Sequence, residues 1–401
     1  MSRVAIVGGG AAGLMVAGFL SQNHDVVVYD KNEKVGKKLN ITGKGRCNIT
    51  NLCMVEDFLK NVVRGDKFLK TALYSFDSYA CVDFFENLGL ATKVERGDRV
   101  FPQSDKAYDV VCALRDVHCK DVDFCLNTKV LAITKKEDGF VVVTDKGKQI
   151  FDKVIIATGG ASYKGTGSDG DGYKFAKIFG HSVEEIKPAL CPLVIEDWFV
   201  GSLQGVSLKN VQLNVEYDGK KHGEFGEMLF TDKGISGPIV LTVSSLINRA
   251  NQIKMSLDFK PALSEQQLDA RLLRDFEENK NKELKNVLKL LLPKAVADIF
   301  AKAIGLDENK KINNITKAER LAILQGLKKF PLKFAGFYDI DAAIVTSGGV
   351  STKEINPKTF ESKLVEGLYL LGEVLDVDAF TGGFNLQIAW ASAYSCAKNF
   401  G

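Results

Sequence analysis

The sequence feature that most constrains the fold is a glycine-rich segment between two apolar runs near the start of the chain. Residues 4–7 (VAIV) and 26–29 (VVVY) are continuous and rich in β-branched side chains, and three glycines follow the first run. Runs of this kind without polar alternation predict strands that are buried on both faces of a sheet. Helix-forming residues fill 11–23. The pattern therefore predicts a strand–helix–strand unit of a parallel sheet.

The glycines of this unit have the spacing GxGxxG at Gly8, Gly10 and Gly13, and Asp30 ends the second run. Gly8 permits a tight turn, Gly10 lets the backbone approach a pyrophosphate, and Gly13 lets the helix pack on the strand. The start of the helix offers N–H groups and a positive dipole end to phosphates. A carboxylate placed as Asp30 is accepts hydrogen bonds from ribose hydroxyls. The unit predicts a dinucleotide site, and a glycine-rich turn without a ligand is the alternative.

The next segment favours FAD over NAD. A simple NAD domain continues with a helix and another strand, whereas residues 31–51 are rich in Gly, Lys, Asn and Thr and show no apolar period. Long loops without secondary structure are usually functional. We expect this loop to wrap a second part of a large cofactor, and a solvated loop is the alternative. The residues that we expect to do so are Thr42, Gly43, Lys44, Gly45, Arg46, Cys47 and Asn48.

Two later strand ends resemble the first. The run KVIIA (153–157) ends in Thr158 and Gly159, and a strand over 368–371 precedes Gly372 and Glu373. Open α/β sheets bind ligands beyond the carboxyl ends of their strands. These two ends therefore extend the predicted site.

The C-terminal segment adds a third part of the predicted site. Asp376 suits a ribose or ribitol hydroxyl, and a helix that opens after Gly382 and Gly383 offers N–H groups to an oxygen. Negative charge develops near N1 and O2 of a reduced flavin, and the dipole of such a helix stabilises it. An ordinary strand–turn–helix is the alternative for this segment alone.

The composition excludes several classes of protein. The chain has 401 residues, a net charge of 53 − 50 = +3, 37 glycines, 8 prolines and 8 cysteines without a CxxC pair. These values exclude an intrinsically disordered chain and argue against dithiol chemistry and nucleic-acid binding. No apolar run is long enough for a membrane helix, and the N-terminus does not read as a signal peptide. We therefore expect a cytoplasmic protein with no membrane partner and a small-molecule substrate.

The pattern of the chain predicts three domains. A discontinuous α/β domain takes residues 1–190 and 336–401, in which 94–107 is expected to be a polar turn region. Short β-rich runs predict a small β domain over 191–262. Helical periodicity, with caps at Ser264 and Thr316, predicts a helical insert over 263–335. This insert carries 15 basic and 10 acidic residues.

The motifs together resemble one family. VAIVGGGAAGLMVA, KLNITGKGRCNITN, ATGGASYKGTGSDGDGY and GEVLDVDAFTGGFNLQIAWASA are similar to signatures of the bacterial BaiN-like, or aminoacetone-oxidase-like, FAD-dependent oxidoreductases. The resemblance covers the whole chain in order. It implies a split Rossmann-like FAD-binding domain, a β-barrel-like domain, a helical insert and non-covalent FAD. This chain has Ala379 and Phe380 where many relatives have a glycine and a small or polar residue, which affects the expected shape of the pocket.

The resemblance also implies which residues bind the cofactor. The adenosine side and the pyrophosphate turn take Gly8, Gly10, Ala11, Ala12, Gly13, Asp30 and Lys31, with Val130 at the adenine. The flavin side takes Lys38, Thr42, Gly43, Gly45, Arg46, Cys47 and Asn48, and the middle of the cofactor takes Ala157, Thr158 and Gly159. The pyrophosphate, ribitol and flavin take Gly372, Glu373, Asp376, Gly383, Phe384, Asn385 and Leu386.

Three activities remain open from the sequence. The first is an FAD enzyme that moves a hydride through flavin N5, with NADPH or NADH as a transient donor to a C=C bond. The second is a flavin-dependent amine oxidase that uses O2, and the third is an FAD-binding protein that acts on RNA. No catalytic side chain and no metal site are identified. The four histidines lie outside the motifs and are expected to be structural or exposed.

Overall fold

The computed structural model describes all residues from Met1 to Gly401 and divides them into two compact units. The first unit comprises Met1–Ala189 and Ile340–Gly401, and the second comprises Leu190–Asp339. The further division of the second unit into a β-rich and a helical domain stays a prediction.

The core of the first unit is a five-stranded sheet in the order β21-β11-β1-β2-β7. All four neighbouring pairs are parallel. The sheet is an α/β arrangement of the Rossmann type, as the apolar runs predict. Its strands are β1 (Arg3–Val7), β2 (Asp25–Tyr29), β7 (Asp123–Cys125), β11 (Lys153–Ile156) and β21 (Leu368–Leu370).

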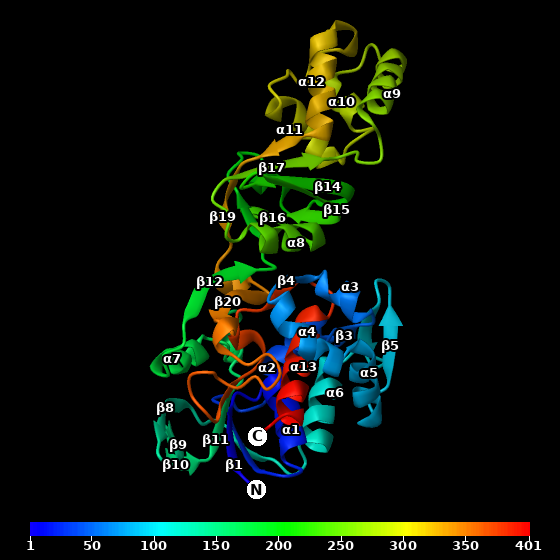
Figure 1. Cartoon of the computed structure of the whole chain (residues 1–401). Helices are drawn as coiled ribbons and strands as arrows, with labels where there is room; N and C mark the ends of the chain where they lie inside the picture. The colour runs from blue at the N-terminus through cyan, green and yellow to red at the C-terminus, as the bar shows by residue number, and fades with distance from the viewer. The chain divides into compact units, whose positions relative to one another are not determined.

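Two helices from opposite ends of the chain pack together beside this sheet. Figure 1 shows α13 (Phe384–Lys398, red) next to α1 (Ala11–Leu20, blue). Another neighbour of α1 is the segment that ends at His118: a side chain at Gly18 would collide with the His118 ring, whose Nε2 lies 3.0 Å from the Met15 carbonyl. Helix α1 ends three residues before the predicted residue 23.

Two loops predicted from the sequence contain regular structure. The segment 31–51 holds α2 (Lys37–Ile41), a 3-10 turn (Thr42–Gly45) and β3 (Thr50–Asn51), and the predicted turn at 94–107 is mostly a hairpin of β5 (Thr92–Glu95) and β6 (Arg99–Pro102). Polar residues hid the hairpin, because β5 is mostly polar and none of its side chains is buried, although three residues of β6 are buried. Both loop predictions were therefore wrong in part.

Further small sheets and helices surround the central sheet. The sheets are β12–β20, β22–β4, β3–β6–β5 and β8–β9–β10. Their remaining strands are β4 (Val62–Arg64), β8 (Val130–Lys136), β9 (Gly139–Thr144), β10 (Gly147–Phe151), β12 (Val183–Ala189), β20 (Val345–Val350) and β22 (Asp378–Ala379). The remaining helices are α3 (Val55–Leu59), α4 (Asp66–Ser75), α5 (Ser78–Asn87), α6 (Ala107–Cys112) and α7 (Asp171–Ile178).

The second unit contains an antiparallel sheet in the order β18-β17-β14-β15-β16-β13-β19. Its two edge strands are consecutive in the chain with only Lys333 between them. Leu332 and Phe334 are two Cα steps of about 3.8 Å apart, so the sheet curls until these ends of its edge strands come close to each other, as in a barrel. The strands are β13 (Leu193–Ile195), β14 (Ser207–Tyr217), β15 (Lys220–Phe230), β16 (Gly234–Ser236), β17 (Ile253–Asp258), β18 (Phe330–Leu332) and β19 (Phe334–Phe337).

Helices complete the second unit. They are α8 (Pro238–Ile247), α9 (Glu265–Glu278), α10 (Leu284–Leu288), α11 (Lys294–Ala303) and α12 (Lys317–Lys328). Helix α8 lies in the segment expected to be β-rich; a proline at its first position starts it, and burial on most sides overrides its β-branched composition. Ser264 and Thr316 cap α9 and α12, as predicted. None of the helices has the combination of length and apolarity needed to span a bilayer.

Candidate functional site

The residues predicted to bind a cofactor follow four neighbouring parallel strands of the first unit. Gly372 follows β21 closely, Ala157–Gly159 follow β11, Gly8 follows β1 and Asp30 follows β2. Because these strands are parallel and adjacent, their carboxyl ends meet at one edge of the sheet. This is the edge where open α/β sheets bind ligands.

The three glycines of the GxGxxG motif have different surroundings. Gly8 has a φ of +108°, and a Cβ there would lie 2.5 Å from the Ala157 carbonyl oxygen. A Cβ at Gly13 would lie 1.9 Å from the Gly8 carbonyl oxygen, whereas a Cβ at Gly10 would meet no atom within 4 Å. Gly8 and Gly13 thus serve packing within the protein. Gly10 faces open space at the start of α1, where a phosphate can approach the backbone.

The helices α1 and α13 both begin without a cap. Their N-cap residues are Gly10 and Gly383, which have no side chain to accept a hydrogen bond, and neither first turn holds an acidic residue. In contrast, Ser264 and Thr316 cap α9 and α12 through reciprocal capping boxes. The N–H groups of Ala11, Ala12 and the start of α13 are therefore free to donate to an anion.

The carboxylate of Asp30 is held by two backbone amides, one from the glycine turn after β1 and one from the chain after β2. Its Oδ2 accepts a hydrogen bond from the Gly9 amide at 2.9 Å, and its Oδ1 accepts from the Asn32 amide at 2.8 Å. The neighbouring Lys31 extends to Asp169 and Asp171, at 2.6 and 3.1 Å. The carboxylate of Asp30 is held at the end of β2, where a ribose is expected, while the ammonium of Lys31 is occupied by two acids.

The expected adenine contact, Val130, lies close to Asp30 in the fold. The amide of Thr128 donates to the Asp30 carbonyl at 2.9 Å, and Val130 begins β8 two residues later. The Val130 side chain is buried. The structure thus brings Val130 to the adenosine side of the predicted site.

An ion pair joins helix α2 to the end of β21. Nζ of Lys38 lies 2.8 Å from Oε2 of Glu373 and donates a hydrogen bond to Ser162 Oγ at 2.9 Å. Oε1 of Glu373 accepts from the Thr346 amide at 2.9 Å. Each side chain of the pair is 23% exposed. The sequence reasoning missed Ser162 and Thr346; the signal for Thr346 was a hydroxyl directly after the apolar residues 342–345.

The segment after β11 packs against Thr346, whose amide binds Glu373. The Ala161 amide donates to Thr346 Oγ1 at 2.8 Å, and a Cβ at Gly160 would lie 2.3 Å from that oxygen. The buried Oγ1 of Thr158 has no hydrogen-bond partner and lies against Gly172 of α7. Gly159 adopts a φ of +72° next to it. Glycines are required here because the chain passes so close to its neighbours.

The loop after α2 has a strained backbone. Positive φ angles occur at four positions of this loop: Gly43, Lys44, Gly45 and Cys47. Lys44 and Cys47 are not glycines, so this backbone conformation costs free energy at both. Thr42 Oγ1 donates to the Leu39 carbonyl at 2.7 Å, which fixes the start of the loop. Strained backbone of this kind concentrates at ligand sites.

The side chains of Arg46 and Cys47 point away from this strained backbone. The Arg46 guanidinium binds Glu95 and Asp105 of the β5–β6 region and lies 4.2 Å from the centre of the Phe101 ring. Hydrogen bonds from Arg46 lower the pKa of Glu95. Cys47 is fully buried, and burial raises the pKa of its thiol to about 12. A contact of these two residues with a flavin would therefore come from the backbone.

The end of the loop is fastened to α13. The indole Nε1 of Trp390 donates to the Ile49 carbonyl at 3.0 Å, and Thr50 Oγ1 donates to Gln387 at 2.7 Å. Asn48 precedes this attachment, and its buried Oδ1 has no hydrogen-bond partner. Unsatisfied buried acceptors are rare in native proteins and require an explanation. A donor on a bound ligand supplies one.

The turn before α13 is braced by Asn385. Its Oδ1 accepts from the Ala379 amide at 3.0 Å, and its Nδ2 donates to the carbonyls of Ala379 and Phe380 at 2.8 and 3.2 Å. Phe384 packs edge-on against Phe58, and Leu386 packs against the core. The unusual Ala379–Phe380 pair is therefore held by an amide side chain, and the α13 start keeps a defined position.

Asp376 lies between this turn and the end of β21. Its amide donates to the Val350 carbonyl of β20 at 2.9 Å. A Cβ at Gly372 would lie 3.1 Å from the Cβ of Ala12, so the end of β21 also contacts the start of α1. The structure thus brings the C-terminal motif and the N-terminal motif together.

Two of the four histidines, His118 and His181, are accounted for by packing. His118 stacks edge-on against Phe19 and Phe84, and His181 lies buried between Glu354 and Ser362 at 3.0 and 2.9 Å. All eight cysteines are unbridged, and no group of three or more His, Cys, Asp or Glu side chains is arranged to hold a metal. None of these residues is identified as a catalytic group.

The residues at this sheet edge fit FAD. They provide two uncapped helix starts for a pyrophosphate and for an electron-rich ring edge, open space at Gly10, and a carboxylate after β2. The partnerless acceptor of Asn48 adds a polar contact for the ring. FAD needs donors and acceptors of this kind at well-separated places, and distant parts of the chain supply them.

Comparison with known proteins identifies relatives over the whole chain. The chain is 31% identical to a 3-dehydro-bile acid delta(4,6)-reductase of Clostridium scindens, covering 99% of this chain and 98% of the relative. It is 32% identical to a ribosomal RNA dihydrouridine synthase of Escherichia coli, covering 98% and 96%. The expectation that no nucleic acid takes part stays a prediction, and the second name runs counter to it.

Solved structures share the fold. The 3-ketosteroid delta1-dehydrogenase of Sterolibacterium denitrificans has a TM-score of 0.52 at 12% identity, covering 99% of this chain and 98% of the other. A 3-ketosteroid-delta4-(5alpha)-dehydrogenase of Rhodococcus jostii has a TM-score of 0.51 at 13% identity, covering 99% and 97%. At these identities the likeness concerns the fold alone.

The family assignment rests on nearly the full length. Residues 2–399 match the HI0933-like protein Rossmann domain. The resemblance seen in the motifs is therefore confirmed, and with it the α/β fold class. The chain belongs to the HI0933-like family and is an FAD-dependent oxidoreductase.

Proposed function

We propose that this enzyme reduces a C=C bond conjugated with a carbonyl group, with NADPH or NADH as the electron donor. The observation that carries the proposal is the cofactor cradle at the four strand ends, in a chain about equally similar to a bile acid reductase and a dihydrouridine synthase. The reaction consumes NAD(P)H, a proton and the C=C bond, and it yields NAD(P)⁺ and the saturated product.

FAD, when bound, supplies the hydride carrier between donor and acceptor. We propose that the uncapped start of α1 binds its pyrophosphate and that Asp30 binds the adenosine ribose. The Lys38–Glu373 pair positions the middle of the cofactor, and the uncapped start of α13 donates to the electron-rich edge of the flavin. We propose that the other cofactor-binding residues named from the sequence also contact FAD, Arg46 and Cys47 through their backbone.

The donor binds transiently in this proposal. The sequence shows one strand–helix–strand dinucleotide unit. In this proposal FAD takes the carboxyl edge of the parallel sheet to which that unit belongs. A nicotinamide therefore has to visit the flavin face and leave before the acceptor binds. An amine oxidase would need no such visit, so reduction of the flavin by NAD(P)H separates the two activities.

Two substrates share the required bond. A 3-oxo steroid with 4,6-unsaturation and the uracil ring of RNA both contain a C=C bond conjugated with C=O. The charge of the helical segment favours RNA, whereas the net charge of the whole chain, +3, argued against nucleic acid. Residues 263–335 carry 15 basic and 10 acidic residues, a net +5, and the rest of the chain carries 53 − 15 = 38 basic and 50 − 10 = 40 acidic residues, a net −2. A basic segment on a near-neutral chain suits an anionic polymer.

The test presents both acceptors to the same preparation. FAD-loaded protein is incubated anaerobically with NADPH or NADH and either unmodified ribosomal RNA or a 3-oxo-4,6-dienoic bile acid, and the products are analysed by mass spectrometry. We expect uridine in the RNA to gain two hydrogen atoms. Saturation of the bile acid alone would move the proposal to a small-molecule substrate. Product from neither acceptor, with turnover of amines under O2, would overturn it.

A further inference from the structure

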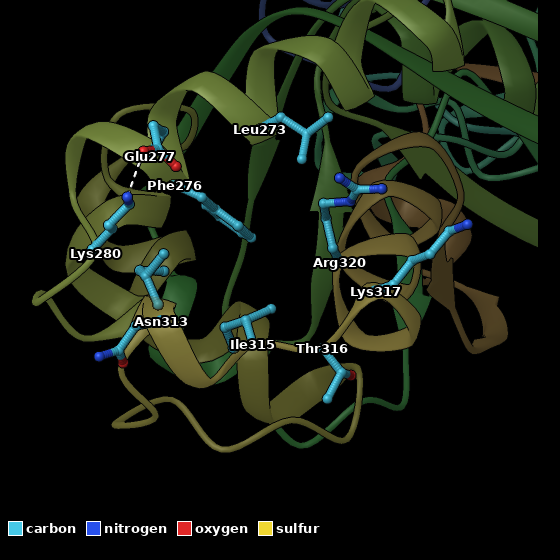
Figure 2. A pocket seen from close by; sticks show the side chains of 10 residues that line it. Leu273, Phe276, Glu277, Lys280, Asn313, Ile315, Thr316, Lys317 and Arg320 are labelled. Atoms are coloured by element: carbon cyan, nitrogen blue, oxygen red, sulfur yellow. Dashed lines mark ion pairs between the residues drawn. The ribbon is translucent and has the colours of Figure 1, made fainter.

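The helical segment of the second unit contains a pocket that the cofactor site does not use. Its volume is about 440 Å³, which lies within the range of about 300–1,000 Å³ for ligand pockets. It lies among α9, the segment before α12 and the first turns of α12 (Figure 2). Its lining residues are Leu273, Phe276, Glu277, Lys280, Ile312, Asn313, Ile315, Thr316, Lys317 and Arg320.

One wall of the pocket is apolar. Figure 2 shows Leu273, Phe276 and Ile315 pointing toward the space between the helices. Leu273 is 48% exposed, although it stands on a helix whose other apolar side chains are mostly buried. Phe276 itself is buried in the core of this unit, so the exposed Leu273 and the partly buried Ile315 offer the surface to a flat apolar group.

The rim of the pocket is cationic. The lining contains three basic residues, Lys280, Lys317 and Arg320, and one acidic residue, Glu277. Its net charge is therefore +2. Glu277 pairs with Lys280, and Arg320 is held at 3.2 Å from Asp269. Lys317 makes no ion pair in the structure, so its charge is available to a ligand.

A nucleotide combines the two properties that this pocket matches, a flat base and an anionic phosphate. Proteins that bind single-stranded nucleic acid contact the faces of bases while basic residues follow the backbone. We propose that the pocket seats one unstacked base of an RNA substrate, with the adjoining phosphates at Lys317 and Arg320. This inference rests on the RNA form of the proposed function and names its recognition site.

Two surface variants test the proposal with matched controls. Lys317→Glu changes the rim, and Lys294→Glu makes the same change in charge at an exposed lysine of α11 outside the pocket. Leu273→Gln changes the apolar wall, and Leu290→Gln makes the same change at another exposed leucine. These side chains are exposed, so folding is expected to survive, and the melting temperature verifies this.

The measurement is the affinity of each FAD-loaded variant for a ribosomal RNA fragment across a salt series. We expect Lys317→Glu to weaken binding about tenfold and to lower the salt dependence by about one released counterion. We expect Leu273→Gln to weaken binding several-fold without changing the salt dependence, because only base stacking is lost. The two controls are expected to change the affinity about twofold or less.

The outcomes separate the inference from the proposed function. RNA binding by the unaltered protein with equal effects of test and control variants would overturn the pocket and leave the RNA activity standing. Failure of the unaltered protein to bind or reduce RNA would overturn both. Binding of polyglutamate, as a probe of an acidic peptide partner, that depends on Lys317 where RNA binding does not would also overturn the RNA assignment.

Discussion

Lys38 and Glu373 are 335 residues apart in the sequence, yet the Lys38 ammonium donates to both carboxylate oxygens of Glu373, at 2.8 and 3.1 Å. The pair joins α2 to the end of β21. It therefore holds α2 against the edge where we propose that the cofactor binds, and we expect it to contribute to the preorganisation of that site.

The Lys38–Glu373 pair is expected to contribute to FAD binding as a unit. Lys38→Met and Glu373→Gln each remove one charge, and each leaves the partner without its ion pair. We expect each variant to weaken FAD binding about tenfold or more, with a coupling energy of about 1–2 kcal/mol between them. A double-mutant cycle of FAD dissociation constants measures this. Additive effects would show that the two residues act separately.

Gly10 and Gly13 are expected to respond differently to the same substitution. Gly10→Ala adds a Cβ where no atom lies within 4 Å. The free energy of unfolding of the FAD-free protein should therefore change by about 1 kcal/mol or less. The added methyl group stands where a pyrophosphate approaches, so FAD affinity should fall strongly. Thermal melting without FAD and titration with FAD measure the two effects.

Gly13→Ala is the matched comparison. Its Cβ would lie 1.9 Å from the Gly8 carbonyl oxygen, so α1 must move away from β1. We expect the free energy of unfolding to fall by about 3 kcal/mol, already without FAD, because the site becomes overpacked. A stable Gly13→Ala variant, or a destabilised Gly10→Ala variant, would contradict the roles assigned to these glycines.

Asn48 is expected to matter only when FAD is present. Its Oδ1 is buried without a partner, so Asn48→Ala removes an unsatisfied acceptor and should leave the FAD-free protein as stable as before or slightly more stable. FAD affinity should fall about tenfold, which corresponds to about 1.4 kcal/mol. Equal FAD affinity of the two proteins would show that the acceptor faces no cofactor donor.

Cys47 is expected to make stability depend on alkaline pH. Burial raises the pKa of its thiol to about 12 in the folded protein. Between pH 9 and 12 the unfolded thiol loses its proton while the folded one keeps it, so this residue stabilises the fold at lower pH and less as the pH rises. The loss is about 1.4 kcal/mol per pH unit.

Urea unfolding of the unaltered protein and of Cys47→Ser at pH 7.5 and about pH 10 tests this effect. The stability advantage of the unaltered protein should shrink at the higher pH. We also expect Cys47→Ser to change FAD affinity more than it changes turnover. A variant that holds FAD fully but has lost all activity would contradict this, and would make the thiol a reacting group.

The sequence predicted the central sheet well because the signals there are local. Continuous apolar runs determine β1, β2 and β11, and the glycine spacing determines the turn that follows β1. The hairpin of β5 and β6 escaped because polar residues dominate it, and α8 escaped because its β-branched composition indicates a strand. In both segments, packing in the folded protein overrides the local preference.

Within the site, the sequence indicated positions but not side-chain directions. Arg46 and Cys47 belong to the predicted flavin loop, yet the guanidinium binds Glu95 and the thiol is buried in the core. Ser162 and Thr346 were missed because their roles depend on Lys38 and Glu373, which come from other parts of the chain. Contacts of this range are determined by the topology of the fold, which the sequence pattern does not display.

The most direct test of the central claim follows the flavin spectrum without oxygen. FAD-loaded protein is mixed with NADPH or NADH in an anaerobic stopped-flow instrument, and unmodified ribosomal RNA is then added to the reduced enzyme. The proposed reductase predicts that a nicotinamide bleaches the flavin and that the RNA restores its colour. Absence of bleaching by either nicotinamide, or recovery of the colour only with O2, would contradict it.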